Sequence, residues 1–348
     1  MKRRCRSTGL TVGVTGPTGD VGKALMRALD LSEEVERVIG LARRPFDPAA
    51  EGLRKVEHRQ GDVLDQAAVW SLARESDVLV HLAWLIFGSV HKTRRVNLEG
   101  SRNVFQAALD NDVDRLVYAS SGAAYGWSRP GARPQQNGAP LPEAAPVRGT
   151  PGHYYSTQKA ESERMLAELT DGTDLSVSVF RISMVAGPSA LSLVAKLPQS
   201  AAWTRTPHQL RSAWRALGVR PALASTDVSF QLLHEDDLAA ALATAVMGRA
   251  APGTFNLAGP DRFTMADLAH ALGWAFVPVP RSAVAATQAL AARLPIVGAQ
   301  AGWLHALRSP LEMDISKAEH ELGWSPRYEA AATLAQTVTS ARRRRLIP

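Results

Sequence analysis

The sequence predicts an α/β protein whose main domain is a doubly wound parallel sheet covered by helices on both faces. Two observations lead to this prediction. The first 180 residues alternate short apolar runs with longer stretches at helical spacing, and such alternation produces parallel strands joined by right-handed crossovers. A glycine-rich turn, Thr15 to Gly22, lies at the first strand-to-helix junction. The chain has 348 residues, enough for this domain and a smaller lobe.

The elements of the main domain follow from the spacing of apolar residues. Short runs rich in Val, Leu and Ile predict strands, and amphipathic stretches predict helices. The predicted strands are Leu10–Thr15, Glu36–Leu41, Lys55–Gln60, Val78–Leu82, Arg115–Ala119 and Ser176–Phe180. The predicted helices are Asp20–Leu29, Asp65–Ala73, Val90–Leu109 and Tyr154–Leu169.

The turn TGPTGDVG contains Gly16, Gly19 and Gly22 in a G-x-x-G-x-x-G array, with Thr18, Asp20 and Val21 between them. Glycines let the backbone turn tightly and approach a pyrophosphate, and the following helix offers free N–H groups and a partial positive charge. The position of the array indicates a Rossmann-type dinucleotide site at these residues. The alternative is a turn with a purely structural role.

The pattern weakens after Gly187. Residues 191–226, rich in Ala, Arg and Trp, indicate an irregular or helical insertion over the sheet edge. Further predicted elements are a strand at Val228–Leu233, a helix from Glu235 to Met247, a strand at Thr254–Leu257 and a mostly helical remainder that ends near Pro326. We assign residues 1–187 plus 228–257 to the dinucleotide-binding domain and residues 188–227 plus 258–348 to a smaller, mostly helical C-terminal substrate lobe.

The second strand ends in GLARRP, which contains Arg43 and Arg44. Enzymes that use NAD usually place an acidic residue there for the ribose hydroxyls, whereas a guanidinium matches a phosphate. The two arginines therefore favour NADP, with NAD possible if both are solvated. Four more residues at strand ends are expected near the cofactor: Asp62, Val63, Leu82 and Ala83.

Tyr155 and Lys159 are four residues apart, which places them on one face of a helix. A nearby ammonium favours the phenolate and lowers the pKa of a tyrosine, which then serves as acid in a reduction or as base in an oxidation. Ser121, at the end of the fifth strand, is placed to donate to a substrate oxygen. Tyr154 and Ser120 are the neighbouring alternatives for these roles.

With these motifs the chain resembles the extended short-chain dehydrogenase/reductase family, also called the NAD-dependent epimerase/dehydratase family. The matching segments are TGPTGDVG, GDV at Gly61, HLAW at His81, VNLEGSRN at Val96, YASSGAAYG at Tyr118, YSTQK at Tyr155, RISMVAGP at Arg181, LLHEDDLA at Leu232, FNLAGP at Phe255 and LGWSP at Leu322. The resemblance covers nearly the whole chain. It implies that Ser121, Tyr155 and Lys159 carry catalysis and that Lys159 also bonds the nicotinamide ribose. It further implies that Asn97 lies near the cofactor, where it orders a helix bend or a water, and that Ile182 lies at the cofactor.

Two departures from the family pattern concern the substrate. Members that act on nucleotide sugars commonly have Asn where this chain has Met184, which donates no hydrogen bond. They also often carry an Arg-Pro-Gly-Asp-like stretch, and the nearest segment here is RSPLEMD at Arg308. The inserted Trp203 and Trp214 are candidate walls of an apolar pocket, or they pack the lobe.

We therefore expect an NADP-preferring ketone reductase or secondary-alcohol dehydrogenase acting on a fairly apolar small molecule. The first alternative is an epimerase or dehydratase of sugars or nucleotide sugars, which regenerates its cofactor within each cycle. The second alternative is a non-catalytic dinucleotide sensor. A sensor would have no need of a Ser, Tyr and Lys set.

Composition bears on partners and compartment. The net charge of +7 comes largely from basic runs near both ends, which we interpret as solvated rather than as sites for nucleic acid or anionic lipid. The longest apolar run, residues 78–88, is too short to span a bilayer. One cysteine, Cys5, allows no disulfide within the chain and suits a reducing compartment. We expect a cytoplasmic protein with no metal site, and the family resemblance implies a homodimer.

Overall fold

The computed structural model describes residues 9–127, 139–207, 209–210, 220–284 and 311–347. Its main sheet has seven strands in the order β10-β6-β5-β4-β1-β2-β3, and every neighbouring pair in it is parallel. This is the Rossmann order extended by one strand at the β6 edge. The strands are β1 (Leu10–Thr15), β2 (Val35–Ala42), β3 (Val56–Gln60), β4 (Val78–His81), β5 (Arg115–Ala119), β6 (Ser176–Ile182) and β10 (Gly253–Leu257).

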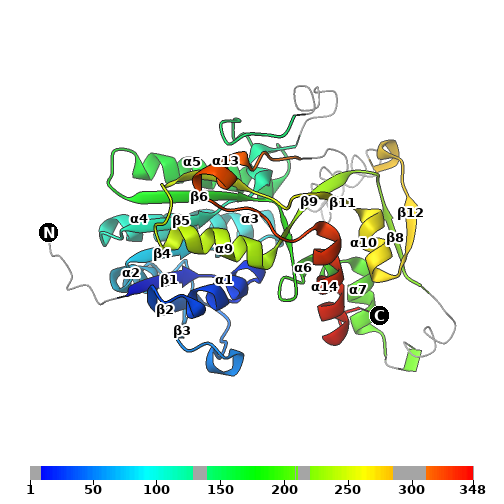
Figure 1. The fold of residues 1–348 in the computed structure, drawn as a ribbon, viewed down its shortest axis with the longest axis horizontal. Helices are drawn as coiled ribbons and strands as arrows, with labels where there is room; N and C mark the ends of the chain where they lie inside the picture. The colour runs from blue at the N-terminus through cyan, green and yellow to red at the C-terminus, as the bar shows by residue number, and fades with distance from the viewer. Residues whose placement is uncertain (1–8, 128–138, 208, 211–219, 285–310, 348) are drawn as a thin grey trace.

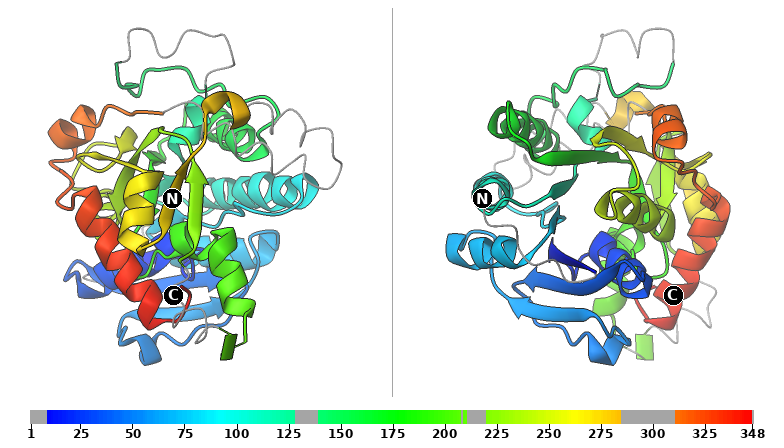
Figure 2. Two further views of the ribbon diagram at one scale, coloured as in Figure 1. Left: turned by 90° about the vertical axis from the view of Figure 1, so that its right-hand side faces the viewer. Right: turned by 60° about the vertical axis from the view of Figure 1, so that its left-hand side comes forward.

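Helices cover both faces of this sheet, which confirms the doubly wound prediction (Figure 2). One face carries α1 (Asp20–Leu31) and α9 (Glu235–Val246), whose apolar sides form one buried cluster with the sheet. The other face carries α2 (Gln66–Glu75), α4 (Gly100–Asp110) and α5 (Tyr154–Thr170) over a second cluster. Strands buried on both faces need continuous apolar runs, and Val78–Val80 in β4 are fully buried.

The predicted helix at 90–109 is interrupted. It begins as α3 (Val90–Arg94), widens into a π-helical turn, η2 (Arg95–Glu99), and continues as α4. A π turn inside an α-helix is uncommon and is frequent at functional sites. This turn carries Asn97 in its middle, buried against the segment that follows β4.

The smaller lobe lies beyond the carboxyl ends of the main strands (Figure 1). Its helices are α6 (Ser192–Ala195), α7 (Pro198–Arg205), α10 (Met265–Leu272) and α14 (Ala330–Arg343). It also contains two small sheets, β11-β9-β7 and β12-β8. Their strands are β7 (Met184–Ala186), β8 (Ala222–Ser225), β9 (Ser229–His234), β11 (Arg262–Thr264) and β12 (Ala275–Pro278). A third buried cluster contains residues of all of these elements except α7.

Three details differ from the sequence expectations. β9 pairs with β7 and β11 in a small sheet, although we placed residues 228–257 in the dinucleotide domain. The short helix α13 (Ser316–Glu321) packs on the main sheet through Ala318 and Leu322, although we placed it in the lobe. The helix α14 lies wholly after Pro326, where we expected the helical part of the chain to end. Its buried Leu334 and Val338 complete the lobe core. The two-domain division itself remains a prediction. Within the described residues no helix has both the length and the apolar content to cross a bilayer.

Candidate active site

The glycine-rich turn connects β1 to α1 at the carboxyl edge of the main sheet. Gly16 has a φ of +76°, which favours glycine, and a Cβ there would lie 2.8 Å from the Ala83 backbone nitrogen. A Cβ on Gly22 would collide with the Gly16 carbonyl oxygen. Both positions therefore need glycine, because the turn is packed tightly between the end of β4 and the start of α1.

The start of α1 has the features of an anion site. Gly19 is the N-cap residue, and a Cβ there would meet no heavy atom closer than 3.5 Å. The Asp20 carboxylate accepts a hydrogen bond from the Ser192 backbone nitrogen (3.2 Å), which turns it towards the smaller lobe. The first N–H groups of a helix have no partner within the helix and attract anions. The turn from Gly16 to Gly22, with Thr18 and Val21, therefore fits the pyrophosphate of a dinucleotide.

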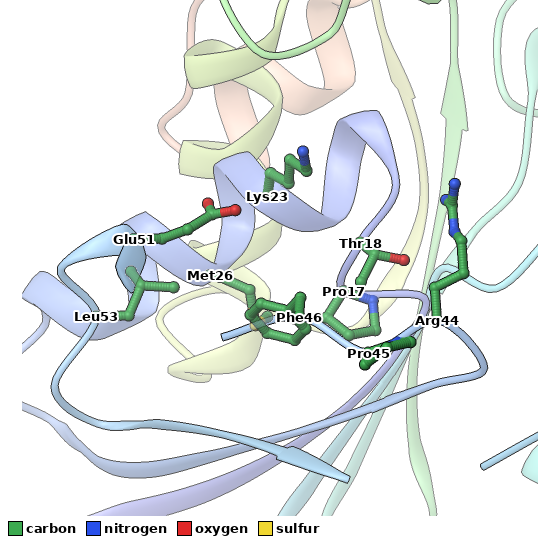
Figure 3. A pocket seen from close by; sticks show the side chains of 9 residues that line it. All are labelled: Pro17, Thr18, Lys23, Met26, Arg44, Pro45, Phe46, Glu51 and Leu53. Carbon is green, nitrogen blue, oxygen red and sulfur yellow. The ribbon is translucent and has the colours of Figure 1, made fainter. Parts of the chain in front are cut away.

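A cavity of about 210 Å³ lies beside this turn, between α1 and the segment that follows β2 (Figure 3). Its lining includes Thr18 from the turn, Lys23 from α1 and Arg44 from the segment after β2. Arg43 has a different neighbour, since its Nη1 lies 3.9 Å from Asp62 Oδ2. Two cationic side chains, Lys23 and Arg44, and one carboxylate, Glu51, thus border one cavity next to the phosphate turn.

The other expected cofactor residues lie at the ends of β3 and β4. The Asp62 carboxylate accepts a backbone N–H two residues further on (3.0 Å). The Leu82 backbone nitrogen donates to the Thr15 carbonyl (3.1 Å), and the Ala83 nitrogen lies 3.3 Å from Thr15 Oγ1. Leu82 and Ala83 therefore lie against the turn, whereas the Asp62 carboxylate is bound within its own loop. The Val63 side chain is instead buried in the cluster under α4.

The two serines that follow β5 have separate partners. Ser120 is buried, and its hydroxyl donates to the Glu163 carboxylate on α5. Ser121 is partly exposed, and its hydroxyl accepts the Ala123 backbone N–H (3.2 Å) and shares a side-chain hydrogen bond with Tyr155. The structure thus brings Ser121, not Ser120, to the tyrosine.

The two tyrosines at the start of α5 are separated in the same way. The Tyr154 hydroxyl donates to the Ile86 carbonyl (2.8 Å), so it is engaged by the segment after β4. The Tyr155 ring packs edge-on to Trp84, with 6.4 Å between centroids. Burial raises the pKa of Tyr155, and its hydrogen bond with Ser121 acts in the opposite direction. Tyr155 is therefore a neutral phenol at neutral pH.

Lys159 is buried one helical turn after Tyr155. Its Nζ donates to the Ala119 carbonyl (2.6 Å) and lies 3.7 Å from the centroid of the Trp84 ring. Burial lowers the pKa of Lys159 to about 7, and the charge of Glu163 opposes this shift. We expected Lys159 to lower the pKa of Tyr155. In this structure burial raises that pKa, and the opposing contribution comes from Ser121.

Asn97 and Ile182 do not face the site with their side chains. Asn97 Oδ1 accepts the Leu85 backbone N–H (2.7 Å), while its Nδ2 donates to the Leu85 carbonyl (3.0 Å) and to Gln158 Oε1 (2.9 Å). The Ile182 side chain packs in the cluster beneath α1 and α9, while its carbonyl accepts a hydrogen bond from the Ser121 hydroxyl (3.5 Å). Asn97 therefore holds the segment after β4 in place, and Ile182 contributes to the core.

On the substrate side, Met184 packs against the core of the smaller lobe and Trp203 is only 5% exposed. Trp203 is thus better described as packing the lobe than as the wall of an open pocket. Trp214 and Arg308 lie outside the described residues.

Three residues near the site were not singled out from the sequence. Trp84 stands in the HLAW motif, two residues after the predicted fourth strand, but a tryptophan near a strand end is usually a packing residue. Lys23 lies one turn into α1, and Glu163 lies one turn after Lys159 on α5. Helical spacing from the motif residues is the signal that would have found the last two.

The profile of the family described as NAD dependent epimerase/dehydratase matches residues 12–258. The uncharacterized protein y4nG of Sinorhizobium fredii is 26% identical over 340 residues, which cover 94% of this chain and 77% of that protein. L-arabinose 1-dehydrogenase (NAD(P)(+)) of Haloferax volcanii is 31% identical over 180 residues, which cover 49% of this chain and 65% of that enzyme. The chain spans only 30% of the length of another relative, from Mycobacterium tuberculosis.

Among solved structures, the fold is similar to that of DesIV, a dTDP-glucose 4,6-dehydratase from Streptomyces venezuelae with NAD and TYD bound. The TM-score is 0.71 at 20% identity, and the match covers 97% of this chain and 98% of that one. At this level of identity the likeness concerns the fold alone.

Proposed function

Because the chain belongs to the NAD-dependent epimerase/dehydratase family, we propose that it moves a hydride between a nicotinamide cofactor and a carbon that alternates between carbinol and carbonyl. The observation that carries this proposal is the grouping of Ser121, Tyr155 and Lys159 at the carboxyl edge of the sheet, beside a turn that fits a pyrophosphate. The sites of parallel α/β folds lie at this edge.

Each of the three side chains has a distinct task in this proposal. The bound nicotinamide supplies or accepts the hydride. Tyr155, a neutral phenol at neutral pH, donates the proton to the substrate oxygen in the reducing direction. Ser121 holds that oxygen beside the phenol, and Lys159 provides the positive charge that favours the phenolate when the proton leaves.

We further propose that the cofactor is NADP rather than NAD. Support comes from the cavity beside the turn, which Lys23 and Arg44 border and which would accept the 2′-phosphate. The guanidinium of Arg43 instead lies 3.9 Å from the Asp62 carboxylate. Calorimetric titration with both cofactors tests this proposal. We expect NADP to bind more tightly than NAD, and tighter binding of NAD would contradict the proposal.

For the substrate, the comparisons favour a sugar or nucleotide sugar over the apolar ketone that we expected. A related enzyme is named as an L-arabinose dehydrogenase, and a protein of the same fold is named as a dTDP-glucose dehydratase. We propose a dehydrogenase or epimerase/dehydratase of a hydroxylated, sugar-like molecule. Met184, in place of an amide donor, argues for a sugar that lacks the nucleoside diphosphate.

An apolar carbonyl compound stays as the second candidate because of the segment after β4. Ile86 is 40% and Phe87 51% exposed there, immediately beyond Trp84 and the Tyr154 contact. Exposed apolar side chains beside a catalytic group are suited to an apolar ligand.

One experiment separates these possibilities. The protein is incubated with free aldoses and NADP⁺, with cyclic ketones and NADPH, and with UDP- and dTDP-glucose plus catalytic cofactor. Stoichiometric formation of NADPH with aldoses supports the sugar dehydrogenase. Stoichiometric consumption of NADPH with ketones supports the apolar reductase. New nucleotide sugars without net cofactor change identify an epimerase or dehydratase. Tight NADP binding with no turnover of any compound would favour the sensor and reject the enzymatic proposal.

A further inference from the structure

Trp84 occupies a central position between the two halves of the proposed cofactor site. It follows Ala83, whose backbone is in contact with the phosphate turn at Gly16. Its ring lies against Lys159 and Tyr155 on the other side. A dinucleotide that reaches from the turn to the catalytic pair therefore has to pass this residue.

The indole ring of Trp84 is the aromatic face nearest to the Lys159 ammonium among the described contacts. Nζ lies 3.7 Å from the Trp84 centroid, compared with 5.0 Å from the Tyr118 centroid. Trp is the strongest aromatic partner for a cation, and the interaction is largest where water is excluded. Among the described residues no carboxylate oxygen forms an ion pair with Lys159, so the ring and the Ala119 carbonyl hold the ammonium.

Other charged and titratable groups surround this lysine. His81 on β4 and Tyr118 on β5 lie on the sheet side, and both are buried. Tyr155 and Glu163 lie on α5 itself, and Arg181 on β6 neutralises Glu163. Glu163 supplies the charge that opposes the effect of burial. Arg181 therefore partly cancels the stabilising effect of Glu163 on the Lys159 ammonium, and the ring of Trp84 supplies a further favourable contact.

The backbone around Trp84 is fixed on its C-terminal side. Both backbone groups of Leu85 are bound by Asn97, and the Ile86 carbonyl is bound by Tyr154. By contrast, the Trp84 Nε1 has no hydrogen-bond partner within the described part of the chain, although it is buried. The ring orientation is therefore set by packing, through its contacts with Lys159, with Tyr155 and with the buried cluster beneath α2 and α4, and not by a hydrogen bond of its own.

We propose that Trp84 is a positioning residue for Lys159: its indole face holds the ammonium charged and in place beside Tyr155. The π-helical turn serves the same purpose, because it presents Asn97, which fixes the segment that carries Trp84. Through Lys159 the residue affects both cofactor binding and proton transfer. The effect of Trp84 on proton transfer rests on the proposed function, whereas its effect on the charge and position of Lys159 does not.

The test measures Lys159 directly. The chain has seven lysines, so protein labelled with ¹³C-lysine gives few resonances, and a Lys159→Arg variant assigns the relevant one. In the wild type its side-chain protons, lying over the indole face, are expected upfield of the other six. In Trp84→Leu the upfield shift disappears and the titration midpoint falls by about 0.5–1.5 pH units, the range of a buried cation–π contact. Trp84→Phe, which keeps an aromatic face, restores part of both effects.

Trp70→Leu is the matched control. It also removes a tryptophan with a cation nearby, Arg74 at 5.7 Å, but on the exposed surface of α2. Its Lys159 resonance should equal that of the wild type. A midpoint that is unchanged or higher in Trp84→Leu, or equal shifts in the Leu and Phe variants, would overturn the proposal.

A second readout, the pH dependence of the NADP dissociation constant, separates this inference from the proposed function. The alkaline loss of binding should move down in Trp84→Leu by the same amount as the NMR midpoint. If both shifts occur in a protein that turns over no substrate, the proposed function fails and the inference stands. If turnover is found and neither shift occurs, the inference fails alone.

Discussion

Glu163→Gln is the substitution for which the structure gives the clearest expectation. Glu163 lies on α5, one turn after Lys159, and forms a bidentate pair with Arg181 on β6: Nη2 to Oε2 is 2.7 Å, and Nε to Oε1 is 3.2 Å. Both side chains are 8% exposed. The Ser120 hydroxyl also donates to this carboxylate, and the Arg181 Nη1 continues to the Tyr125 hydroxyl (2.9 Å).

The glutamine keeps the shape but leaves the Arg181 guanidinium as a buried charge without its counter-ion. Breaking a buried pair in this way costs about 3–5 kcal/mol. At about 2.1 cal/mol/K per residue, the entropy of unfolding of this chain is about 0.7 kcal/mol/K. The expected decrease in Tm is therefore about 4–7 °C.

Differential scanning calorimetry measures this decrease. The double variant Glu163→Gln/Arg181→Met removes both charges, so it should recover part of the lost Tm, since an apolar replacement of a buried pair is often tolerated. The same glutamine removes the charge that raises the pKa of Lys159, so the titration midpoint of Lys159 should also fall. A Tm decrease below about 1 °C, or a double variant no more stable than the single one, would refute this reasoning.

Three further predictions concern charge. Arg44→Ser should weaken NADP binding by about 10–100-fold and leave NAD binding unchanged, as measured by calorimetry; equal losses for both cofactors would contradict the phosphate assignment. Burial lowers the pKa of His81 to about 3, so between pH 6.5 and pH 3 the unfolded chain binds a proton that the folded chain does not. Wild-type stability in urea should therefore fall with decreasing pH by up to about 1.4 kcal/mol per unit relative to His81→Asn, and parallel curves would reject it. Lys159 has a pKa of about 7 in the folded chain and 10.5 in the unfolded chain, so above pH 7 only the unfolded chain keeps this proton. Wild-type stability should therefore rise from pH 7 upward, relative to Lys159→Met, by up to about 1.4 kcal/mol per pH unit. A difference that does not change with pH would show that the lysine is not desolvated.

The main sheet could be predicted because its elements are governed by local patterns. β1 and β5 have the predicted bounds, since runs of buried residues bounded by polar ones fix where a fully covered strand begins and ends. The pairing of β9 with β7 could not be predicted, because it depends on where the chain returns after the insertion and not on the residues of β9. The helix α14 was missed because its buried side is made of Ala, Thr, Leu and Val, a weak apolar pattern on its own.

At the site, spacing located the turn, the tyrosine and the lysine, because one helical turn places two side chains together whatever the rest of the fold does. Spacing did not reveal the direction of the Lys159 ammonium. That direction depends on Trp84, which lies 75 positions earlier and meets it only through the order of β4 and β5 in the sheet. The position of Asn97 near the cofactor, which the family resemblance implies, stays a prediction; its contact in the structure is the backbone of Leu85.

The pKa of Tyr155 illustrates why a pair of residues does not determine an electrostatic effect. The motif predicts an acidic phenol, but burial of Tyr155 raises its pKa in this arrangement. A cofactor with a positive nicotinamide ring would favour the phenolate again. The acidification is therefore expected to depend on the oxidised cofactor rather than on Lys159 alone.

The central claim is that the Tyr155 hydroxyl transfers the proton. Its most direct test is single-turnover hydride transfer by Tyr155→Phe, compared with the wild type at equal cofactor occupancy. Removal of a general acid should slow this step by about 10²–10⁴-fold while the dissociation constant of NADP stays within a factor of about two. Wild-type rates in the phenylalanine variant would contradict the account.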